Sequence, residues 1–395
     1  MMYKSLFILG RQPAIGRAEL ESLLGAEHVQ PIGEQAMASD AAPDQIDFAR
    51  IGSSIRMSKV LTQLDTTQWP AIARYLADAF PQHLDYLPAE GKLKLGLSVF
   101  GLPATTQQLF RTGLELKKIC KKAGRSVRLV PNTEPALSSA AVLHNQLTSE
   151  LGWELLLVKD GNKTWLAQTV AVQDITAYAR RDQNRPKRDA RVGMLPPKLA
   201  QTIVNLATGS LPGAEEHVVL DPFCGTGVVL QEALLIGYGI YGTDLEPRMI
   251  DYSRANLEWL AVRGEEATHL LEAGDATTYQ WTHPFSVVAS ETYLGRPLTS
   301  WPGSDTLHEI IGTCNVIIEK FLKNIAEQTK PGQRLCLAVP AWRGPGDRFH
   351  HLPLLDHLGE IGYNRQRFEH VRDAELVYYR PEQLVGRELL VITRK

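Results

Sequence analysis

The chain has 395 residues, of which 44% are hydrophobic and 22% are charged, and its formal net charge is −2. This length predicts two or three domains, and the composition excludes a disordered protein and a membrane protein, since no apolar run is long enough to span a bilayer. A net charge near zero also argues against nucleic-acid binding through overall charge, so the distribution of the charges matters more.

The first segment, to about residue 90, mixes strand and helix patterns. Residues 3–9 predict a strand, residues 15–25 and 69–80 predict helices, and an Ala-, Asp- and Pro-containing loop is expected near 36–46. The apolar stretch at the N-terminus lacks a small-residue cleavage site and continues into an amphipathic helix pattern, so it does not have the form of a signal peptide. A cytoplasmic location is therefore expected.

The second segment predicts a small α+β module at about 91–174. Its hairpin signal is the turn between Asp160 and Lys163, which contains Gly161 and Asn162 and separates two apolar strand patterns. The other predicted elements are strands at 93–101 and 126–130 and helices at 105–123 and 138–147.

Two basic clusters lie in the middle of the chain. Six bases and no acid occur between Lys117 and Arg128, and six bases against two acids occur at 179–191. Each cluster could be a solvated helix face or linker, or it could be part of a nucleic-acid surface. The second cluster falls in a Pro- and Arg-rich stretch, 180–197, that is expected to connect two domains and to lead into a helix through Pro196 and Pro197.

The four cysteines are widely separated and form no C-x-x-C pair, and no histidine lies near them at metal-ligand spacing. Free thiols and no structural zinc are therefore expected for Cys120, Cys224, Cys314 and Cys336.

From residue 217 onward, strand and helix patterns alternate regularly. A long helix is expected at about 304–328, another helix at 348–361, and closing strands at 364–371 and 386–393. Continuous apolar strands separated by helices indicate an α/β domain with a mostly parallel sheet covered on both faces. Such a sheet binds its ligand at the carboxyl ends of its strands, where functional residues are expected.

The most informative motif is the run DPFCGTG, Asp221 to Gly227, which follows the first of these strands and opens a helix. Gly225 and Gly227 would let the backbone approach a ligand closely, and the free N–H groups of the helix N-terminus would point toward it. The absence of Gly-Lys-Ser/Thr after the glycines argues against a P-loop, and Leu230 breaks the glycine pattern of NAD-binding domains.

Acids end the next two strands as well. Asp244 could accept hydrogen bonds from the two hydroxyls of a ribose, and Asp275 could accept one from an adenine amino group. Charge at three successive strand ends costs free energy unless it is paired or used. The pattern favours binding of an adenosyl cofactor over an incidental tight turn.

The DPFCGTG turn resembles the first motif of amino-methyltransferases that modify the exocyclic amines of nucleobases. More of the chain is similar to the tRNA guanosine-N2 methyltransferases that carry a THUMP domain: the opening LGRQPAIGRAELESLLG, the run Arg191 to Ala200, and the run YRPEQLVGRE from Tyr379 to Glu388. The resemblance covers most of the chain, although only the 221–227 motif is sharply specific.

This resemblance implies a ferredoxin-like region at 1–90, a THUMP RNA-binding module at 91–174, a linker at 175–197 and a class I, Rossmann-like methyltransferase domain with a seven-stranded sheet at 198–395. It implies S-adenosylmethionine as cofactor, tRNA as partner, and no metal. The implied cofactor residues are Asp221, Pro222, Phe223, Gly225, Thr226, Gly227, Asp244, Leu245, Asp275 and Ala276. The implied RNA-binding residues are Lys117, Lys121, Lys122, Arg125, Arg191 and Lys198.

The chain departs from this family at the catalytic motif. The family has Asp/Asn-Pro-Pro-Tyr after the fourth strand, whereas this chain has Ser290-Glu291-Thr292-Tyr293. In the usual motif the acid or amide and a proline carbonyl accept hydrogen bonds from the target amine, and the aromatic ring stacks on a flipped-out base. Tyr293 aligns with the stacking residue, and either Ser290 or Glu291 is the acceptor; a strand-end Glu291 paired with an arginine such as Arg296 is the structural alternative.

Further residues near the expected site have two interpretations. Arg191, Lys198, Arg296 and Arg343 are either phosphate contacts or solvated cations, and Trp342 lines a base pocket or is a core side chain. Three functions remain open on the sequence. They are a tRNA methyltransferase acting on an exocyclic guanine amine, an RNA-binding protein that keeps the fold but has lost catalysis, and a DNA amino-methyltransferase.

Overall fold

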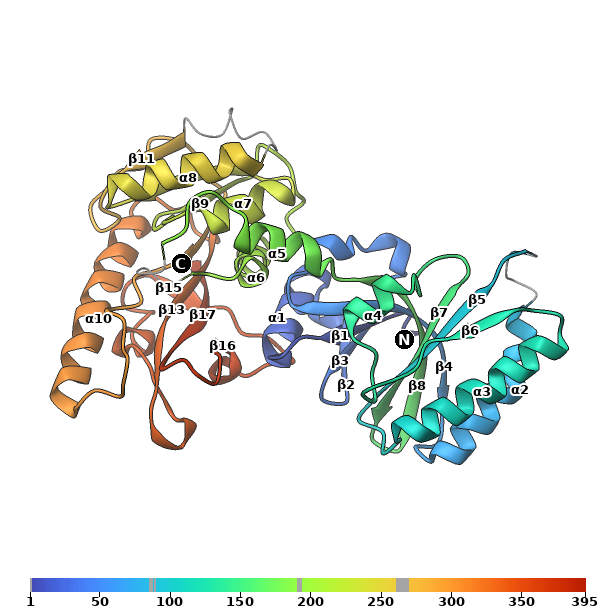
Figure 1. Cartoon of the computed structure of the whole chain (residues 1–395). Coiled ribbons are helices and arrows are strands. Elements are labelled where there is room, and N and C mark those ends of the chain that lie inside the picture. Colours follow the sequence, from blue (N-terminus) through green and yellow to red (C-terminus); the bar gives the residue numbers. More distant parts are fainter. Residues whose placement is uncertain (1, 85–87, 89, 190–193, 261–269) are drawn as a thin grey trace. The chain divides into compact units, whose positions relative to one another are not determined.

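The computed structural model describes residues 2–84, 88, 90–189, 194–260 and 270–395. The chain forms two compact units, drawn in Figure 1. The first comprises Met1–Arg17, Leu24–Ala49 and Ser53–Ile175, and the second comprises Ala18–Leu23, Arg50–Gly52 and Thr176–Lys395. No helix in the described ranges is both long and apolar enough to cross a membrane.

The first unit is built on a single eight-stranded sheet in the order β2-β3-β1-β4-β8-β7-β5-β6. Its strands are β1 (Ser5–Leu9), β2 (Val29–Ile32), β3 (Ala36–Ser39), β4 (Ser54–Leu64), β5 (Leu93–Phe100), β6 (Val127–Leu129), β7 (Gly152–Asp160) and β8 (Lys163–Val172). The expected module boundary at residue 90 therefore falls inside one continuous sheet. The predicted β7–β8 hairpin is confirmed, with Asp160 paired to Lys163 across a two-residue turn.

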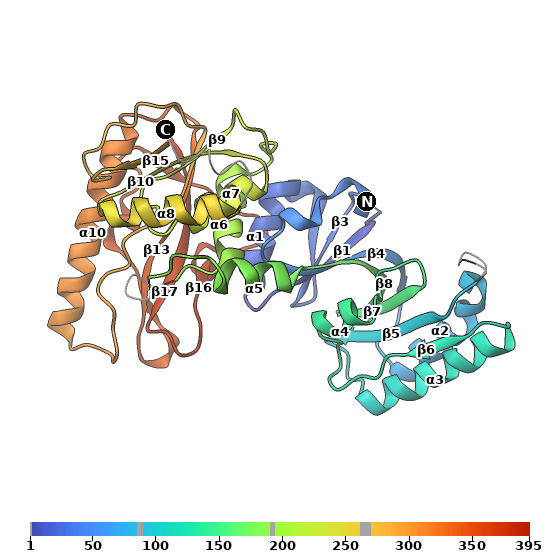
Figure 2. The same ribbon diagram turned by 45° about the horizontal axis from the view of Figure 1, so that its top comes forward.

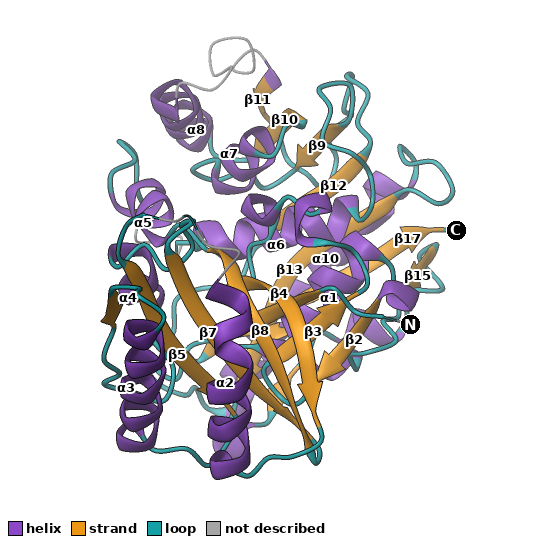
Figure 3. Ribbon diagram, turned by 90° about the vertical axis from the view of Figure 1, so that its right-hand side faces the viewer, coloured by secondary structure: helices purple, strands orange, loops and turns teal. Residues whose placement is uncertain are grey.

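Helices α2 (Trp69–Leu84) and α3 (Thr106–Lys122) lie side by side on one face of this sheet (Figure 3). Their apolar residues, among them Trp69, Phe80 and Leu116, share one core with the inward residues of β5, β7 and β8. A capping box fixes the start of α3, because Thr105 accepts a hydrogen bond from the backbone N–H of Gln108 and Gln108 accepts one from the backbone N–H of Thr105. The remaining helices up to residue 183 are α1 (Pro13–Leu24), η1 (Ala26–His28), η2 (Pro43–Gln45), η3 (Phe48–Arg50), α4 (Ser139–His144) and α5 (Ile175–Gln183).

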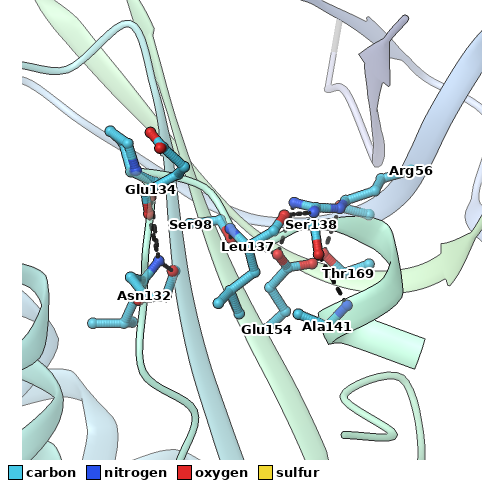
Figure 4. A network of polar contacts seen from close by, with 12 residues as sticks. Arg56, Ser98, Asn132, Glu134, Leu137, Ser138, Ala141, Glu154 and Thr169 are labelled. Carbon is cyan, nitrogen blue, oxygen red and sulfur yellow. Dashed lines mark hydrogen bonds and ion pairs between the residues drawn. The ribbon is translucent and has the colours of Figure 1, made fainter. Parts of the chain in front are cut away.

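Strand β4 joins the two halves of the first sheet and carries buried polar residues. Arg56 is 1% exposed and forms an ion pair of 2.7 Å with Glu154 of β7. Figure 4 shows that Ser98 and Thr169 also donate hydrogen bonds to this carboxylate, at 2.5 and 2.6 Å. The sheet centre is therefore held by a buried polar network as well as by apolar packing.

The second unit contains a nine-stranded sheet whose main order is β11-β10-β9-β12-β13-β17-β15. Strands β11, β10, β9, β12 and β13 are parallel, whereas β17, β15, β14 and β16 pair antiparallel. The strands are β9 (Val218–Asp221), β10 (Gly239–Asp244), β11 (Leu271–Ala273), β12 (Val287–Glu291), β13 (Arg334–Arg343), β14 (Phe349–His350), β15 (Tyr363–Arg365), β16 (Val377–Tyr378) and β17 (Val385–Arg394). The α/β class is confirmed. The sheet is mixed rather than mostly parallel, since its last segments return as hairpin-like strands.

Both faces of the second sheet are covered. Helix α10 (Ser304–Ala326) runs along one face (Figures 1 and 2), and its residues Ile318 and Phe321 share a core with Leu337 and Leu390 of the strands. Helix α6 (Pro197–Thr208) contacts β12 and β13. The other helices are α7 (Val228–Leu235), α8 (Pro247–Leu260), η5 (Pro345–Asp347), η6 (Pro353–Asp356) and η7 (Asp373–Glu375).

Two expected elements were wrong. Residues 36–46 do not form only a loop, because β3 occupies Ala36–Ser39 and pairs with both β1 and β2. The helix expected at 348–361 is absent, and the described residues form β14 and the short helix η6 instead. The buried leucines of this stretch, Leu352, Leu354 and Leu358, reach the core from within η6 and from the residues on either side of it.

Candidate active site

The glycine turn after β9 adopts the backbone conformation that its sequence predicts. Gly225 and Gly227 have φ values of +51° and +78°, which only glycine adopts readily. A Cβ at Gly227 would meet Ser253 Oγ at 2.9 Å, so the turn also packs tightly against α8. A Cβ at Gly225 would meet nothing closer than Phe223 O at 4.0 Å, so the space beside this glycine is open to a ligand.

Asp244 ends β10 and lies against this turn. Its Oδ2 accepts a hydrogen bond of 2.9 Å from the backbone N–H of Gly225, and its Oδ1 accepts one of 2.9 Å from Glu246. Burial raises the pKa of Asp244 above its ordinary value, although these two backbone donors oppose the rise. Each oxygen keeps a second lone pair for a ribose hydroxyl.

Asp275 lies at the neighbouring strand end, because β11 is parallel to β10 and ends beside it. The backbone N–H of Gly274 donates to Asp244 O at 2.9 Å, which ties the two loops together. Asp275 is exposed, and its Oδ1 accepts hydrogen bonds from the backbone and hydroxyl of Thr277 at 2.9 and 2.8 Å. The structure thus brings the ends of β9, β10 and β11 to one edge of the sheet, as the sequence predicted.

Asp221 lies at the same edge but inside the protein. It is 1% exposed, and its Oδ1 accepts hydrogen bonds from Ser290 Oγ at 2.6 Å and from the backbone N–H of Phe223 at 3.2 Å. Burial raises the pKa of Asp221 to about 8, and the charges of Asp244 and Glu291 add to the rise. Three carboxyl groups therefore influence one another here, and Asp221 is the one most easily kept protonated.

Helix α8 contributes two residues that were not predicted. Ser253 Oγ donates to Gly225 O at 2.8 Å, and Asn256 Nδ2 donates to Thr226 O at 2.9 Å. Asn256 also exchanges two hydrogen bonds of 2.9 Å with the backbone of Lys187, so it fixes the basic segment beside the turn. The available signal was two polar residues on the otherwise apolar face of a predicted helix.

The remaining predicted cofactor residues differ in accessibility. The side chain of Leu245 is 72% exposed directly after β10, whereas Ala276 is 3% exposed and belongs to the core. Phe223 packs edge-on against Phe321 with ring centroids 5.0 Å apart. Open space beside Gly225, spare carboxylate lone pairs and an exposed apolar side chain together fit the sugar and purine of an adenosyl group.

The three residues of the catalytic motif have different environments. Ser290 is fully buried and donates to Asp221, whereas Glu291 forms an ion pair with Arg387 of β17. Glu291 is thus paired with an arginine, as the structural alternative described, but the partner is Arg387 and not Arg296, which that alternative gave as an example. Burial raises the pKa of Glu291, and the Arg387 charge opposes the rise.

Tyr293 follows this strand end and is 42% exposed. It lines an open pocket that is bounded on the other side by α10. The other lining residues are Gly295, Arg296, Glu309, Ile310, Thr313 and Cys314. An exposed aromatic ring at the mouth of a pocket is suited to stacking on a planar group.

Other predicted residues lie outside this edge or are already engaged. Trp342 is fully buried in the core, and Arg343 binds Asp347 and Pro381 O at 2.9 and 2.7 Å. Lys198 is partly buried, with its Nζ 5.2 Å from the ring centroid of Tyr178. Arg191 lies outside the described residues.

The basic residues of the first unit are mostly on the surface. Lys118, Lys121, Lys122 and Arg128 are exposed, while Lys117 and Arg125 are intermediate. All four cysteines are free, as expected, and buried. In the described part of the chain, no group of His, Cys, Asp and Glu side chains could hold a metal ion.

Comparison with known proteins agrees with this geometry. Residues 185–340 match the family model described as UPF0020, RMKL-like methyltransferase domain. A tRNA (guanine(10)-N2)-dimethyltransferase of Pyrococcus abyssi is 28% identical over 159 residues, which are 39% of this chain and 45% of the relative. One of the same name from Methanocaldococcus jannaschii is 30% identical over 151 residues, 38% of each chain. The chain thus matches less than half the length of these curated relatives.

Solved structures extend the likeness in fold to the whole chain. TrmN from Thermus thermophilus has a TM-score of 0.55 at 17% identity and is covered over 100% of both chains. A possible methylase from Clostridium difficile 630 has a TM-score of 0.53 at 13% identity, with 98% of this chain and 97% of that chain covered. The description of the family, a methyltransferase domain, agrees with the expected cofactor S-adenosylmethionine. Residues 185–340 therefore match a family of methyltransferase domains, and the names of the curated relatives agree with the resemblance to the tRNA guanosine-N2 methyltransferases.

Proposed function

We propose that this protein is an S-adenosylmethionine-dependent tRNA methyltransferase that acts on the exocyclic N2 amine of a guanosine. The observation that carries the proposal is the edge of the second sheet, where a glycine turn, Asp244 and Asp275 meet, and where the exposed Tyr293 follows the end of the neighbouring strand β12. The names of the curated relatives support guanosine as the target nucleoside and tRNA as the substrate. The cytoplasm, where its thiols stay reduced, is the proposed site of action.

The proposed cofactor roles follow from the available atoms. Asp244 would accept hydrogen bonds from the ribose hydroxyls, and Asp275 would accept one from the adenine amine through Oδ2. Gly225 and the start of α7 would leave room for the methionine part, and Leu245 would cover one face of the adenine. When bound, the cofactor supplies a methyl group on a positively charged sulfur, and the protein aligns the amine with it.

We also propose that the first unit holds the tRNA. The proposal divides it into a ferredoxin-like region at 1–90 and a THUMP module at 91–174, with 175–197 as a connection that begins in helix α5. The exposed lysines on the last turn of α3, Lys121 and Lys122, would contact phosphates. Lys117 and Arg125 would contribute less, because both are partly covered.

The decisive test is incubation of the protein with tritiated S-adenosylmethionine and bulk tRNA, followed by mapping of the labelled nucleotide. Label on the N2 of a guanosine is expected, and its loss is expected in Tyr293→Ala but not in Tyr75→Ala, which removes an exposed tyrosine from α2. No label on tRNA together with label on duplex DNA at the same salt concentration would instead identify a DNA methyltransferase.

One observation favours a second candidate function. Both candidate acceptors, Ser290 and Glu291, already have a partner in the protein, so a catalytically inactive tRNA-binding protein would have the same site. Retained tRNA binding without any incorporated label would identify that function.

A further inference from the structure

The hydroxyl of Ser290 is committed to a neighbouring strand. Ser290 is fully buried at the end of β12, and it donates to Asp221 at the end of β9 at 2.6 Å. The strands are neighbours in the sheet, with Val287 opposite Val219 and Val288 opposite Leu220. Ser290 therefore connects two strand ends and has no exposed oxygen for a substrate amine.

Glu291 differs from Ser290 in both accessibility and free capacity. Its side chain is 15% exposed, and its Oε1 accepts a hydrogen bond from Arg387 Nε. Within the described ranges, no residue donates a hydrogen bond to the second oxygen, Oε2. Arg387 thus holds Oε1, and Oε2 remains available to a ligand at the end of β12.

The register of the sheet explains why Arg387 reaches Glu291. Glu291 lies opposite Ala338 of β13, and Ala338 lies opposite Leu389 of β17, two residues beyond Arg387. Residues two apart on a strand share a face, so Arg387 and Glu291 project from the same side across β13. Arg387 is 5% exposed, and its own strand runs on into the core.

Thr292 fixes the backbone that follows. Its backbone N–H donates to Ala338 O at 3.1 Å and its Oγ1 donates to the same oxygen at 3.2 Å. The related motif uses two prolines at this point, whereas here two hydrogen bonds to β13 restrain the chain. The loop therefore leaves the sheet in a defined direction before the exposed Tyr293.

We propose that Glu291 is the residue that accepts a hydrogen bond from the target amine, and that Arg387 is its positioning residue. This inference rests on the proposed function and names the acceptor that the sequence left open between Ser290 and Glu291. Arg387 holds Oε1, so that Oε2 points to where the amine nitrogen is placed between the stacked base and the cofactor. In the transfer, the nitrogen forms a bond to the methyl carbon as the carbon–sulfur bond breaks, and the electron pair of that bond stays on sulfur. The proton that the nitrogen then loses passes to Glu291 Oε2.

Arg387 also favours the ionised form of Glu291, which is the form that accepts a hydrogen bond through either oxygen. Burial raises the pKa of Glu291, and the Arg387 charge is the group that opposes the rise. The other charged group facing Glu291 is Asp221 of β9, whose negative charge, where present, works in the same direction as burial. Removing the arginine charge therefore makes Glu291 harder to ionise.

The test compares Arg387→Met, Arg387→Lys and Glu291→Gln with a matched control in the same sheet. The control is Arg365→Met, which breaks another, partly buried ion pair, between Arg365 of β15 and Glu388 of β17 at 2.8 Å. For each variant, kcat and KM for tRNA are measured from pH 5 to 9, with cofactor binding and thermal unfolding measured in parallel.

Arg387→Met is expected to lower kcat about 10²-fold, the size of a misplaced catalytic group, while KM and cofactor affinity stay near wild type. The acidic limb of its pH profile should move to higher pH, and Arg387→Lys should restore part of kcat and move the limb back. Glu291→Gln should lower kcat and remove the limb. Arg365→Met should lower the unfolding temperature and leave the limb in place.

The inference is overturned if Arg387→Met and Arg365→Met lower kcat alike with no movement of the limb, or if Glu291→Gln keeps wild-type kcat. If Arg387→Met does not fold, Arg387→Lys and Glu291→Gln decide by the same two readouts. Failure of the proposed function has a different signature, since wild-type protein would then leave tRNA unlabelled before any variant is compared.

Discussion

Each unit of the molecule carries a buried arginine–glutamate pair, and the two pairs differ in what remains free. In the first unit, Glu154 is fully buried, and both of its oxygens accept hydrogen bonds from side chains of neighbouring strands (Figure 4). In the second unit, Glu291 is held by Arg387 through one oxygen at the end of a strand, where the protein surface begins. Arg56 is 1% and Arg387 5% exposed, so the arginines themselves are similar.

The difference separates a structural pair from one available to a ligand. A fully buried carboxylate whose oxygens both accept hydrogen bonds from neighbouring strands fixes which strands meet, but another molecule cannot reach it. A carboxylate with one oxygen held and one free at the sheet edge can change partners during a reaction. The two glutamates therefore differ both in exposure, 0% for Glu154 and 15% for Glu291, and in whether both oxygens accept a hydrogen bond from the protein.

The largest predicted effect is on the stability contributed by the fully buried pair, Arg56–Glu154. Arg56→Met would leave Glu154 buried and charged without its cation, and the expected loss is about 3–5 kcal/mol of unfolding free energy. The double variant Arg56→Met/Glu154→Leu should recover much of this loss, because no buried charge is left unpaired. Urea unfolding followed by circular dichroism measures both. If Arg56→Met is as stable as wild type, the ion pair Arg56–Glu154 does not contribute to the unfolding free energy.

The second prediction concerns the open carboxylates. Asp244→Ala should weaken binding of S-adenosylmethionine on the order of 10- to 100-fold, the range for losing hydrogen bonds to a charged group. The control is Asp251→Ala, which removes an exposed carboxylate of α8 whose partner is Arg254 at 3.0 Å. Calorimetric titration gives both affinities. Equal binding by Asp244→Ala and wild type would remove Asp244 from the cofactor site.

Much of the second unit could be predicted from the sequence because its signals are local. The strand, glycine turn and helix around Gly225 follow one another along the chain, and parallel strands bring Asp244 and Asp275 to the same edge. Strand β4 was missed for the opposite reason. Its buried positions include Arg56 and Ser58, whose partners Glu154 and Thr169 lie about a hundred residues away, so no hydrophobic alternation marks the strand.

The same limit applies to the catalytic motif. Arg387 lies 96 residues after Glu291, and their contact depends on the antiparallel register of β17 against β13. The run around Arg387 was noticed as a family resemblance, but one sequence contains no information on which carboxylate it faces. In both units, therefore, the ion pairs between strands far apart in the sequence could not be predicted and became visible only in the structure.

The third prediction sharpens the comparison within the active site, because Asp221 is as deeply buried as Glu154 but forms no ion pair with a cation of the described residues. Its pKa is raised to about 8, so it stays protonated in the folded protein while the unfolded chain ionises near pH 4. The stability that it contributes is thus complete below about pH 4 and is lost as the pH rises to about 8. Asp221→Asn is neutral throughout, and its Oδ1 can still accept from Ser290 and Phe223.

Cofactor-free Asp221→Asn should therefore match wild type near pH 4 and unfold a few degrees higher than wild type at pH 8.5, as scanning calorimetry would measure. Asp251→Asn, a change of the same kind at an exposed aspartate, should leave the difference between the two pH values unaltered. Parallel unfolding curves for Asp221→Asn and wild type would mean that Asp221 ionises normally in the folded protein.

The smallest predicted effect is at the surface of the first unit. The pair Arg56–Glu154 is buried, so the tRNA proposed to bind this unit must contact exposed side chains. Lys121→Gln and Lys122→Gln each remove one exposed charge from the end of α3. Each should weaken tRNA binding a few-fold and reduce the slope of log affinity against log salt by about one, because one fewer counterion is released. Lys163→Gln, an exposed lysine of the β7–β8 hairpin already beside Asp65 at 3.5 Å, is the control for total charge. If all three variants shift the salt slope equally, the lysines act through net charge and α3 is not the phosphate-binding surface. If only the α3 variants shift it, the two units divide the work between an outer surface that holds the tRNA and a sheet edge that carries the methyl transfer.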